Sequence, residues 1–294
     1  MKKIAVITDT SSGITIEEGK QHGFFVIPMP ITIDNKEFHD NVDITFEDFY
    51  KAQASGADIH TSTPAAGTVL DLWNECLKTY DEIVYIPLSS GLSSSCVSAE
   101  MLAEDYDGKV QVVNNQRIAV TQRQSVYDAL ALAKNGRSAA EIKKILEDAK
   151  FDSSIYIMLD TLEYLKKGGR ITPAAATFAK ILNLKPVLQI HGEKLDAFSK
   201  SRGIKQAKKV LLNAVKDDVE KRLGGYDPSD PNIWFEIAHT QNEAAAEEFK
   251  QDVLSVFPNA HVHIDPLPLV IAVHIGPGSL AFACSKVIPE AKLN

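Results

Sequence analysis

Short apolar runs alternate with helical patterns through the first half of the chain. The runs occupy residues 4–7, 83–86 and 110–113. Strands that are apolar over their whole length are expected where both faces of a sheet are covered, as in a parallel sheet flanked by helices. The pattern therefore predicts an α/β arrangement in this half.

Polar residues mark where the helices between these runs begin. Thr45 and Asp48 open an amphipathic segment. Ser138 and Glu141 form a capping box in front of a second one,. We predict an N-terminal α/β domain over residues 1–152, built on a parallel sheet.

The second half has a different pattern, in which several apolar runs alternate with polar positions. This alternation favours an antiparallel or mixed sheet with one solvated face. Helices are predicted over residues 203–223 and from Thr240, with Glu243 as the capping partner,. We expect a C-terminal mixed or antiparallel α/β domain over residues 153–294. The predicted strands are residues 155–159, 187–190, 234–238, 261–265 and 269–273.

Composition narrows the class of protein. Of 294 residues, 31 are basic and 39 acidic, which gives a net charge of -8. This balance argues against a large positive surface for nucleic acid or an anionic membrane, although a local basic patch stays open. We therefore expect no nucleic-acid partner.

The chain also lacks the marks of secretion and of membrane insertion. Only four apolar residues precede Thr8, too few for a signal peptide, and no apolar run approaches the roughly 18 residues of a spanning helix,. Cys76, Cys96 and Cys284 are far apart and have no CxxC spacing, so neither a disulfide framework nor a zinc site is indicated,. A cytoplasmic location without stable membrane insertion is the expectation.

The most unusual local feature is a serine-rich turn at residues 88–96, directly after an apolar strand. In an open parallel sheet, ligands bind at the carboxyl ends of strands, where hydroxyls and loop amides can hold an anion. Ser89, Ser90, Ser93 and Ser94 are candidates. The alternative is a turn that only caps the next helix. A nucleophilic serine has less support, because the second glycine of a nucleophile elbow is missing and no partner is evident.

Two further hydroxyl-rich turns occur at residues 8–12 and 60–64. Each taken alone is explained as a helix cap. If their strands are neighbours in the sheet, the three turns would converge on a neutral cleft that holds a carboxylate or a phosphate by hydrogen bonds.

A basic glycine turn and two histidine patterns each have two interpretations. Residues 165–173 could bind phosphate or could simply close a helix, and they lack the Walker spacing,. His261, His263 and Asp265 share one face of a strand, which indicates a solvent-facing surface or, less plausibly, a metal site,. His274 follows an apolar run that we predict as a strand, and is either a core histidine or a polar anchor,.

Taken in order, these motifs resemble the DegV family of bacterial fatty-acid-binding proteins. The resemblance covers nearly the whole chain. It implies two α/β domains with a long-chain fatty acid between them, and some members serve as the acyl-carrying subunit of a fatty acid kinase whose catalytic subunit brings ATP. The matching segments are residues 8–11, 61–64, 88–93, 162–171, 185–188 and 274–281.

By resemblance, a set of polar residues receives roles in fatty acid binding. Thr61, Ser62, Ser93 and His274 would hold the carboxylate of the fatty acid, and Arg170 would contact the partner kinase. The resemblance implies no metal, no catalytic residue and no cofactor beyond the bound lipid.

Three places depart from the family pattern. Thr63 stands where glutamine is common, Ser94 and Ser95 stand where glycine and a hydroxyl residue are common, and residues 114–116 replace an Asp-Ser pair. The side chains beside Ser93 could narrow the head-group pocket or alter the chain preference.

The leading hypothesis is a non-catalytic protein that binds a fatty acid such as palmitate and presents its carboxylate to a kinase, with possible onward carriage of the acyl phosphate. Burying about fourteen methylenes at about 0.8 kcal/mol each offers roughly 11 kcal/mol before ordering costs. The alternative is a stand-alone serine hydrolase or small-molecule phosphotransferase that uses the same hydroxyl loops with Lys166, Lys167 and Arg170,. A DNA-binding regulator lacks a basic recognition stretch.

Overall fold

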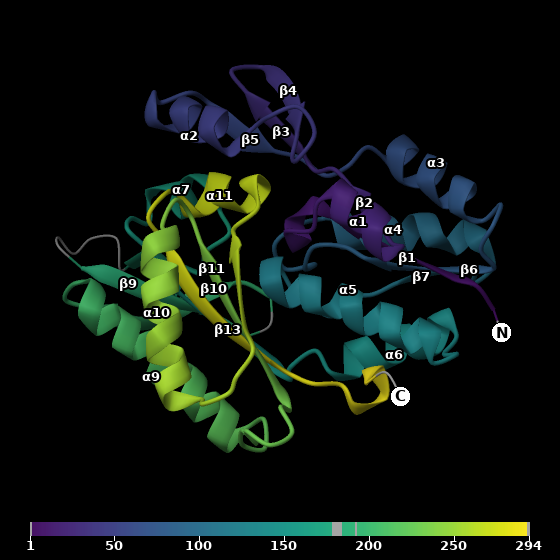
Figure 1. Ribbon diagram of the computed structural model, residues 1–294. Coiled ribbons are helices and arrows are strands. Elements are labelled where there is room, and N and C mark those ends of the chain that lie inside the picture. Colours follow the sequence, from purple (N-terminus) through teal and green to yellow (C-terminus); the bar gives the residue numbers. More distant parts are fainter. Residues whose placement is uncertain (1, 178–183, 192, 293–294) are drawn as a thin grey trace. The chain divides into compact units, whose positions relative to one another are not determined.

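The computed structural model describes residues 2–177, 184–191 and 193–292 (Figure 1). The chain divides into two compact units. Unit 1 comprises Met1–Lys150, Pro268–Val270 and Ile288–Asn294, and unit 2 comprises Phe151–Leu267 and Ile271–Val287. The division after Lys150 lies beside the predicted boundary after residue 152. The structure differs from the predicted division in that two later segments group with unit 1.

Unit 1 contains the predicted parallel sheet, with four strands in the order β2-β1-β6-β7 and every pairing parallel. The three strands predicted in this half correspond to β1, β6 and β7. The sheet consists of β1 (Ile4–Asp9), β2 (Phe25–Ile27), β6 (Glu82–Ile86) and β7 (Val110–Val112).

Helices cover both faces of this sheet, which explains why its strands are apolar throughout. Val6 and Val84 pack into one cluster with α5 and α6. Ile7 and Tyr85, at the opposite phase, pack with α3 and α4,. The helices of unit 1 are α1 (Ile16–His22), α2 (Phe46–Ala54), α3 (Ala66–Cys76), α4 (Ser95–Ala103), α5 (Ala119–Lys134) and α6 (Ala139–Asp148).

A small antiparallel sheet in unit 1 was not predicted. It has the order β4-β3-β5 and consists of β3 (Pro30–Ile33), β4 (Lys36–His39) and β5 (Ile59–Thr61). Asp34 and Asn35, both at positive φ, form the two-residue hairpin between β3 and β4,. Strands of three or four residues give too little alternation to stand out in the sequence.

Unit 2 is built on a six-stranded mixed sheet in the order β10-β9-β8-β13-β11-β12. The β11–β12 pair is parallel and the other pairs are antiparallel, in agreement with the predicted mixed sheet. The strands are β8 (Ser153–Met158), β9 (Lys185–Ile190), β10 (Leu195–Ser201), β11 (Ile233–His239), β12 (Val262–Pro266) and β13 (Leu280–Lys286).

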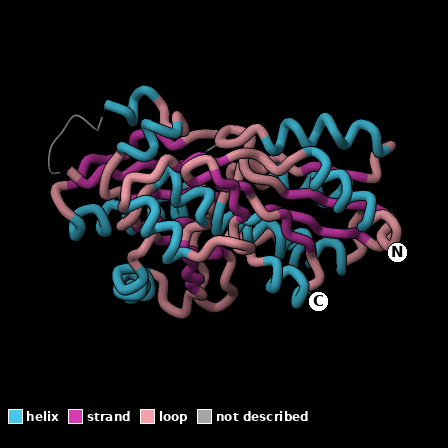
Figure 2. The backbone as a smooth tube through the Cα atoms, turned by 90° about the horizontal axis from the view of Figure 1, so that it is seen from above, coloured by secondary structure: helices cyan, strands magenta, loops and turns pink. Residues whose placement is uncertain are grey.

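Two long helices, α9 (Ile204–Lys221) and α10 (Glu243–Val256), pack on this sheet and build the core of unit 2 (Figure 1). Helices run beside strands in each unit, as the backbone trace shows (Figure 2). Phe282 of β13 lies between Phe235 and Phe249, at ring-centroid distances of 6.0 and 5.4 Å. The shorter helices of unit 2 are α7 (Glu163–Gly168) and α8 (Pro173–Ala176).

The predicted strand over residues 269–273 is wrong. These residues form α11 (Leu269–Ile275), so His274 lies in the last turn of a helix and does not follow a strand. All five residues of the run are buried. A segment that is apolar on every side has no periodicity that separates a buried helix from a buried strand.

The predicted helix start at Thr240 is also wrong. Helix α10 begins at Glu243, after Asn242. The hydroxyl of Thr240 donates to the carbonyl of Gly276 at 2.7 Å and accepts from the N–H of Ser279 at 2.9 Å, so its oxygen serves the turn after α11 and not the start of α10.

Within the described ranges, no helix is both long enough and apolar enough to cross a membrane. Several of the helices are amphipathic. In α6, for example, Ile142 and Leu146 are buried while Lys144 is exposed,.

Replacement of Phe282 by alanine tests the core of unit 2. Because the side chain is fully buried between two other rings, we expect the free energy of unfolding to fall by about 3–5 kcal/mol,. Phe151→Ala is the control, since that ring is 51% exposed, and it should cost about 1 kcal/mol or less,. Urea denaturation followed by circular dichroism measures both. Equal losses in the two variants would contradict the assigned core.

Candidate functional site

The predicted hydroxyl-rich turns at residues 8–12 and 88–96 start side by side, because they follow β1 and β6, which are parallel neighbours. Asp9, the last residue of β1, connects them. Its carboxylate accepts hydrogen bonds from the backbone N–H of Ser11 and from that of Leu88, each at 3.0 Å. One buried side chain therefore fixes the start of both turns.

Gln122 of α5 completes a polar frame behind these turns. Its side-chain amide donates to Asp9, to the Thr8 hydroxyl at 3.2 Å and to the Ile86 carbonyl at 3.1 Å. Burial raises the pKa of Asp9, against the hydrogen bonds from Ser11, Leu88 and Gln122 that lower it,. Asp9 is fully buried, so its role is to hold the backbone of the turns.

The serine turn is closed by its own backbone and by the segment that follows β7. The Ser89 N–H donates to the Arg117 carbonyl at 3.1 Å, and the Ser93 N–H donates to the Ser89 carbonyl at 3.0 Å. The Ser93 hydroxyl shares a hydrogen bond of 2.8 Å with the Ser95 hydroxyl and accepts one from the Ser95 N–H. Ser93 thus lies just before the N-cap of α4, which is Ser94, and is half-buried.

The third hydroxyl turn follows β5 and therefore belongs to the small antiparallel sheet, not to the parallel one. Its backbone is tied to β3, because the Ser62 N–H donates to the Pro30 carbonyl at 3.3 Å. Thr61 is half-buried and Ser62 is exposed.

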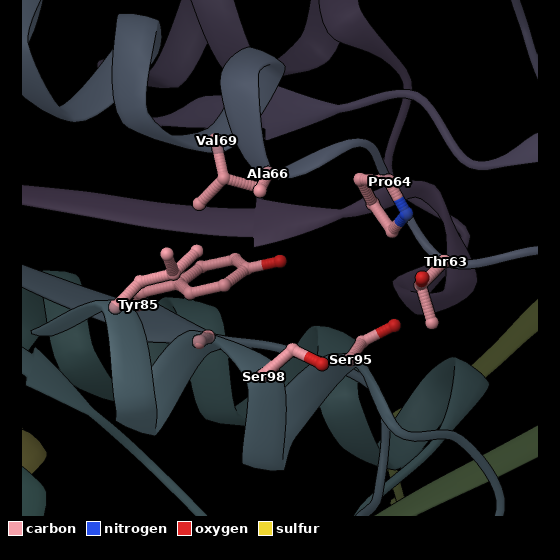
Figure 3. Close-up of a pocket in the computed structure, with 9 residues that line it drawn as sticks. Thr63, Pro64, Ala66, Val69, Tyr85, Ser95 and Ser98 are labelled. Atoms are coloured by element: carbon pink, nitrogen blue, oxygen red, sulfur yellow. The ribbon is translucent and has the colours of Figure 1, made fainter.

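The third turn nevertheless meets the serine turn at a cavity of about 140 Å³ in unit 1 (Figure 3). Thr63 and Pro64 border it from one turn, and Ser95 borders it from the other. Its size is close to that of an apolar cavity of about 150 Å³ that holds benzene, so a segment of about six carbons fits. The lining residues are Thr63, Pro64, Ala66, Val69, Tyr85, Ser95, Ser98, Ala99 and Leu102.

His274 is held in unit 2 by the glycine turn that the sequence singled out. A Cβ atom at Gly168 would overlap the imidazole at Nδ1, so only glycine lets this backbone lie against the ring,. The Arg170 guanidinium donates to the Gly168 carbonyl and fixes the same turn.

The imidazole of His274 is neutral near pH 7. Burial lowers its pKa to about 4, and the positive charge of Arg170 adds to the shift,. A neutral imidazole offers one donor and one acceptor nitrogen, which suits a hydrogen bond to a carboxylate better than an ion pair.

The basic glycine turn at residues 165–173 also closes α7, as one of its two interpretations predicted. Gly169 at φ 69° ends the helix, and its N–H donates to the Leu165 carbonyl at 2.9 Å,. Lys166 and Lys167 are exposed.

The predicted site residues divide between the two units. Thr61, Ser62 and Ser93 belong to unit 1, whereas His274 and Arg170 belong to unit 2 and contribute to one turn. Sequence reasoning missed Asp9 and Tyr85. The sequence could have identified Tyr85 only by its position in β6, where side chains alternate between the two faces of the sheet and Tyr85 lies on the face covered by α3 and α4.

The histidine pattern on β12 matches a solvent-facing strand surface. His263 Nε2 lies 2.7 Å from the Asp265 carboxylate, and His261 is exposed. Among the described residues, no group of three or more histidine, cysteine or acidic side chains could hold a metal ion.

A family model described as an uncharacterised protein of the DegV family matches residues 3–287. The chain belongs to the DegV family. It is 31% identical over 290 residues to a DegV domain-containing protein of Clostridium perfringens, covering 96% of this chain and 97% of the relative. It is 28% identical over 282 residues to the DegV protein of Bacillus subtilis, covering 94% and 97%.

Solved DegV structures have the same fold. A DegV family protein from Thermus thermophilus, described by its fatty acid binding, superposes with a TM-score of 0.88 at 28% identity, over 97% of this chain and 100% of the other. DegV from Bacillus subtilis, described as a fatty acid binding protein, gives 0.84 at 26% identity, over 98% and 100%. These similarities confirm the predicted α/β fold with a parallel and a mixed sheet.

Alanine at Gly168 tests the packing of the glycine turn on His274. We expect Gly168→Ala to displace the imidazole and to change its NMR signals strongly, because the added methyl group would occupy the position of the ring. Gly169→Ala is the matched control. It should cost about 1 kcal/mol of stability for its left-handed backbone while leaving His274 in place, since nothing lies within 4 Å of the added methyl group,. Unchanged imidazole signals in Gly168→Ala would refute the contact.

The pKa of His274 gives a second test. NMR titration should find it near 4, and Arg170→Gln should raise it, because a positive charge that disfavours protonation is removed. The unfolded chain binds this proton near pH 6.5 and the folded chain near 4, so the free energy of unfolding should fall as the pH drops through that window. An ordinary histidine pKa in the wild-type protein would contradict the burial of the ring.

Proposed function

We propose that this protein binds a long-chain fatty acid, with the carboxylate held by Thr61, Ser62, Ser93 and His274. The observation that carries the proposal is the cavity at which two hydroxyl turns meet, where hydroxyl side chains lie beside apolar ones such as Val69 and Leu102. Similar proteins from Thermus thermophilus and Bacillus subtilis are described as fatty acid binding.

The acyl chain and the carboxylate of a fatty acid place different demands on the site, and the residues present can meet those of the carboxylate. An acyl chain supplies affinity in proportion to the apolar area that it buries, at about 0.8 kcal/mol for each methylene. The head group then needs hydrogen bonds and no counter-ion. Hydroxyls such as that of Ser93, and a neutral imidazole such as that of His274, supply them without the desolvation cost of a buried ion pair,.

We further propose that the bound carboxylate is presented to the catalytic subunit of a fatty acid kinase. In this reaction a carboxylate oxygen attacks the γ-phosphorus of ATP, the bond to the β-phosphate oxygen breaks, and acyl phosphate and ADP form. The kinase brings ATP, and this chain positions the acceptor oxygen and carries the acyl phosphate onward. Arg170, half-buried beside His274, is the proposed contact with the kinase.

A stand-alone serine hydrolase has less support. Within the described part of the chain, the Ser93 hydroxyl is bonded to Ser95 and to no histidine or carboxylate that could take its proton,. A fluorophosphonate probe discriminates between the two functions, because stoichiometric labelling of a serine requires an activated nucleophile.

Ser93→Ala tests the proposed head-group site. Loss of a hydrogen bond to a carboxylate is worth about 1.5–3 kcal/mol, so the affinity for palmitate should fall by roughly tenfold or more. Ser94→Ala is the matched control and should bind as the wild type does, because Ser94 is exposed and its side chain makes no capping bond to α4. Native mass spectrometry with organic extraction measures retained lipid, and a palmitate titration gives the Kd.

The same variants decide the kinase step when the fatty acid kinase is added. Ser93→Ala should form less acyl phosphate, and Ser94→Ala should be unaffected. Unchanged lipid content together with unchanged phosphorylation in Ser93→Ala would refute the head-group assignment.

A further inference from the structure

The hydroxyl of Tyr85 lies in the wall of the cavity in unit 1. Tyr85 comes from the middle of the parallel sheet, on the face covered by α3 and α4, and the residue is 1% exposed. Its ring packs edge-on against Trp73, with centroids 5.8 Å apart and an interplanar angle of 70°. Figure 3 shows its hydroxyl directed into the open space between the two helices.

This hydroxyl makes no hydrogen bond with any residue in the described ranges. Burial raises the pKa of Tyr85 well above its ordinary value, so the phenol keeps its proton and remains a donor,. A ligand that displaces water from this hydroxyl without replacing the hydrogen bond leaves the donor unpaired, at a cost of about 1–3 kcal/mol. The group is therefore suited to an acceptor that arrives with a ligand.

The surroundings of Tyr85 define what that acceptor can be. Thr63 and Ser98 add two more hydroxyls to the same cavity, and neither side chain is hydrogen-bonded within the described part of the chain. No charged residue lines the cavity, so a second carboxylate on the ligand would be buried without a counter-ion,. A neutral oxygen that both donates and accepts fits this lining.

The place of the cavity relative to Ser93 sets where on an acyl chain this oxygen would lie. Ser95, the hydrogen-bond partner of Ser93 at 2.8 Å, itself borders the cavity. If a chain with its carboxylate at Ser93 enters this space, one of its first carbons would lie beside Tyr85, because the cavity holds about six carbons,.

We propose that Tyr85 determines specificity, and that it selects fatty acids with a hydroxyl group within about six carbons of the carboxylate. This inference rests on the proposed fatty acid binding and on the head-group position at Ser93. A site with a buried hydrogen-bonding group discriminates against a ligand that lacks the matching oxygen, because the group is then left unpaired.

The test compares ligands that differ only in the position of one hydroxyl. Dissociation constants are measured for hexadecanoic acid, for its 2-, 3- and 5-hydroxy derivatives and for 16-hydroxyhexadecanoic acid. The wild-type protein should bind at least one of the first three derivatives about tenfold or more tightly than the 16-hydroxy acid, whose oxygen lies far from the carboxylate.

Tyr85→Phe keeps the ring and removes only the hydroxyl. It should abolish the positional preference, so that the 2-, 3-, 5- and 16-hydroxy acids bind with similar dissociation constants. A preference that persists in Tyr85→Phe would overturn the assignment to Tyr85. Should the variant not fold, the wild-type series still decides, since an absent positional preference would show that water, not the ligand, satisfies the hydroxyl.

The two proposals fail in different ways. If wild-type protein binds none of these acids, fatty acid binding itself is refuted. If it binds hexadecanoic acid and all hydroxy acids equally, fatty acid binding stands and the inference about Tyr85 is overturned.

Discussion

The carboxylate of Asp9 is the interaction on which the polar end of unit 1 depends. It accepts backbone hydrogen bonds from two turns that are nearly eighty residues apart in the chain, at Ser11 and Leu88. The cost of burying this group is partly offset by the hydrogen bonds that it accepts, including that from Gln122,. Without this carboxylate, the serine turn would lose the hydrogen bond that fixes the backbone of Leu88 at the end of β6.

The other polar residues of the candidate site are placed by the turns in which they lie. The serine turn places Ser93 at the start of α4 and Ser95 at the edge of the cavity. The turn after β5 adds Thr63 from a separate small sheet. In unit 2, a glycine at position 168 allows a backbone to lie directly on His274.

Much of the fold could be predicted, because strands such as β1 and β6 are apolar throughout and lie between clear helix signals. Two of the errors share a cause. The run at residues 269–273 and the central strand β13, which was not predicted, are buried on all sides, so neither carries a periodic pattern,. The small sheet was missed because its strands are too short.

The site was predictable only in part. Hydroxyl-rich turns identify Ser93 as a candidate, and their order along the chain produces the family resemblance. The sequence does not reveal that Tyr85 borders a cavity, since a tyrosine in an apolar strand is most simply a core residue. The packing of Gly168 on His274 joins residues more than a hundred positions apart, and no local pattern encodes such a contact.

The return of the chain to unit 1 near its end affects the order of folding during synthesis. Ile288 belongs to the core of unit 1, and Asn135 donates hydrogen bonds to the carbonyls of Glu290 and Lys292. Residues 1–150 leave the ribosome long before this segment is made. Unit 1 therefore waits for its last core residue while unit 2 is translated, so its apolar surface is open to chaperones during that interval.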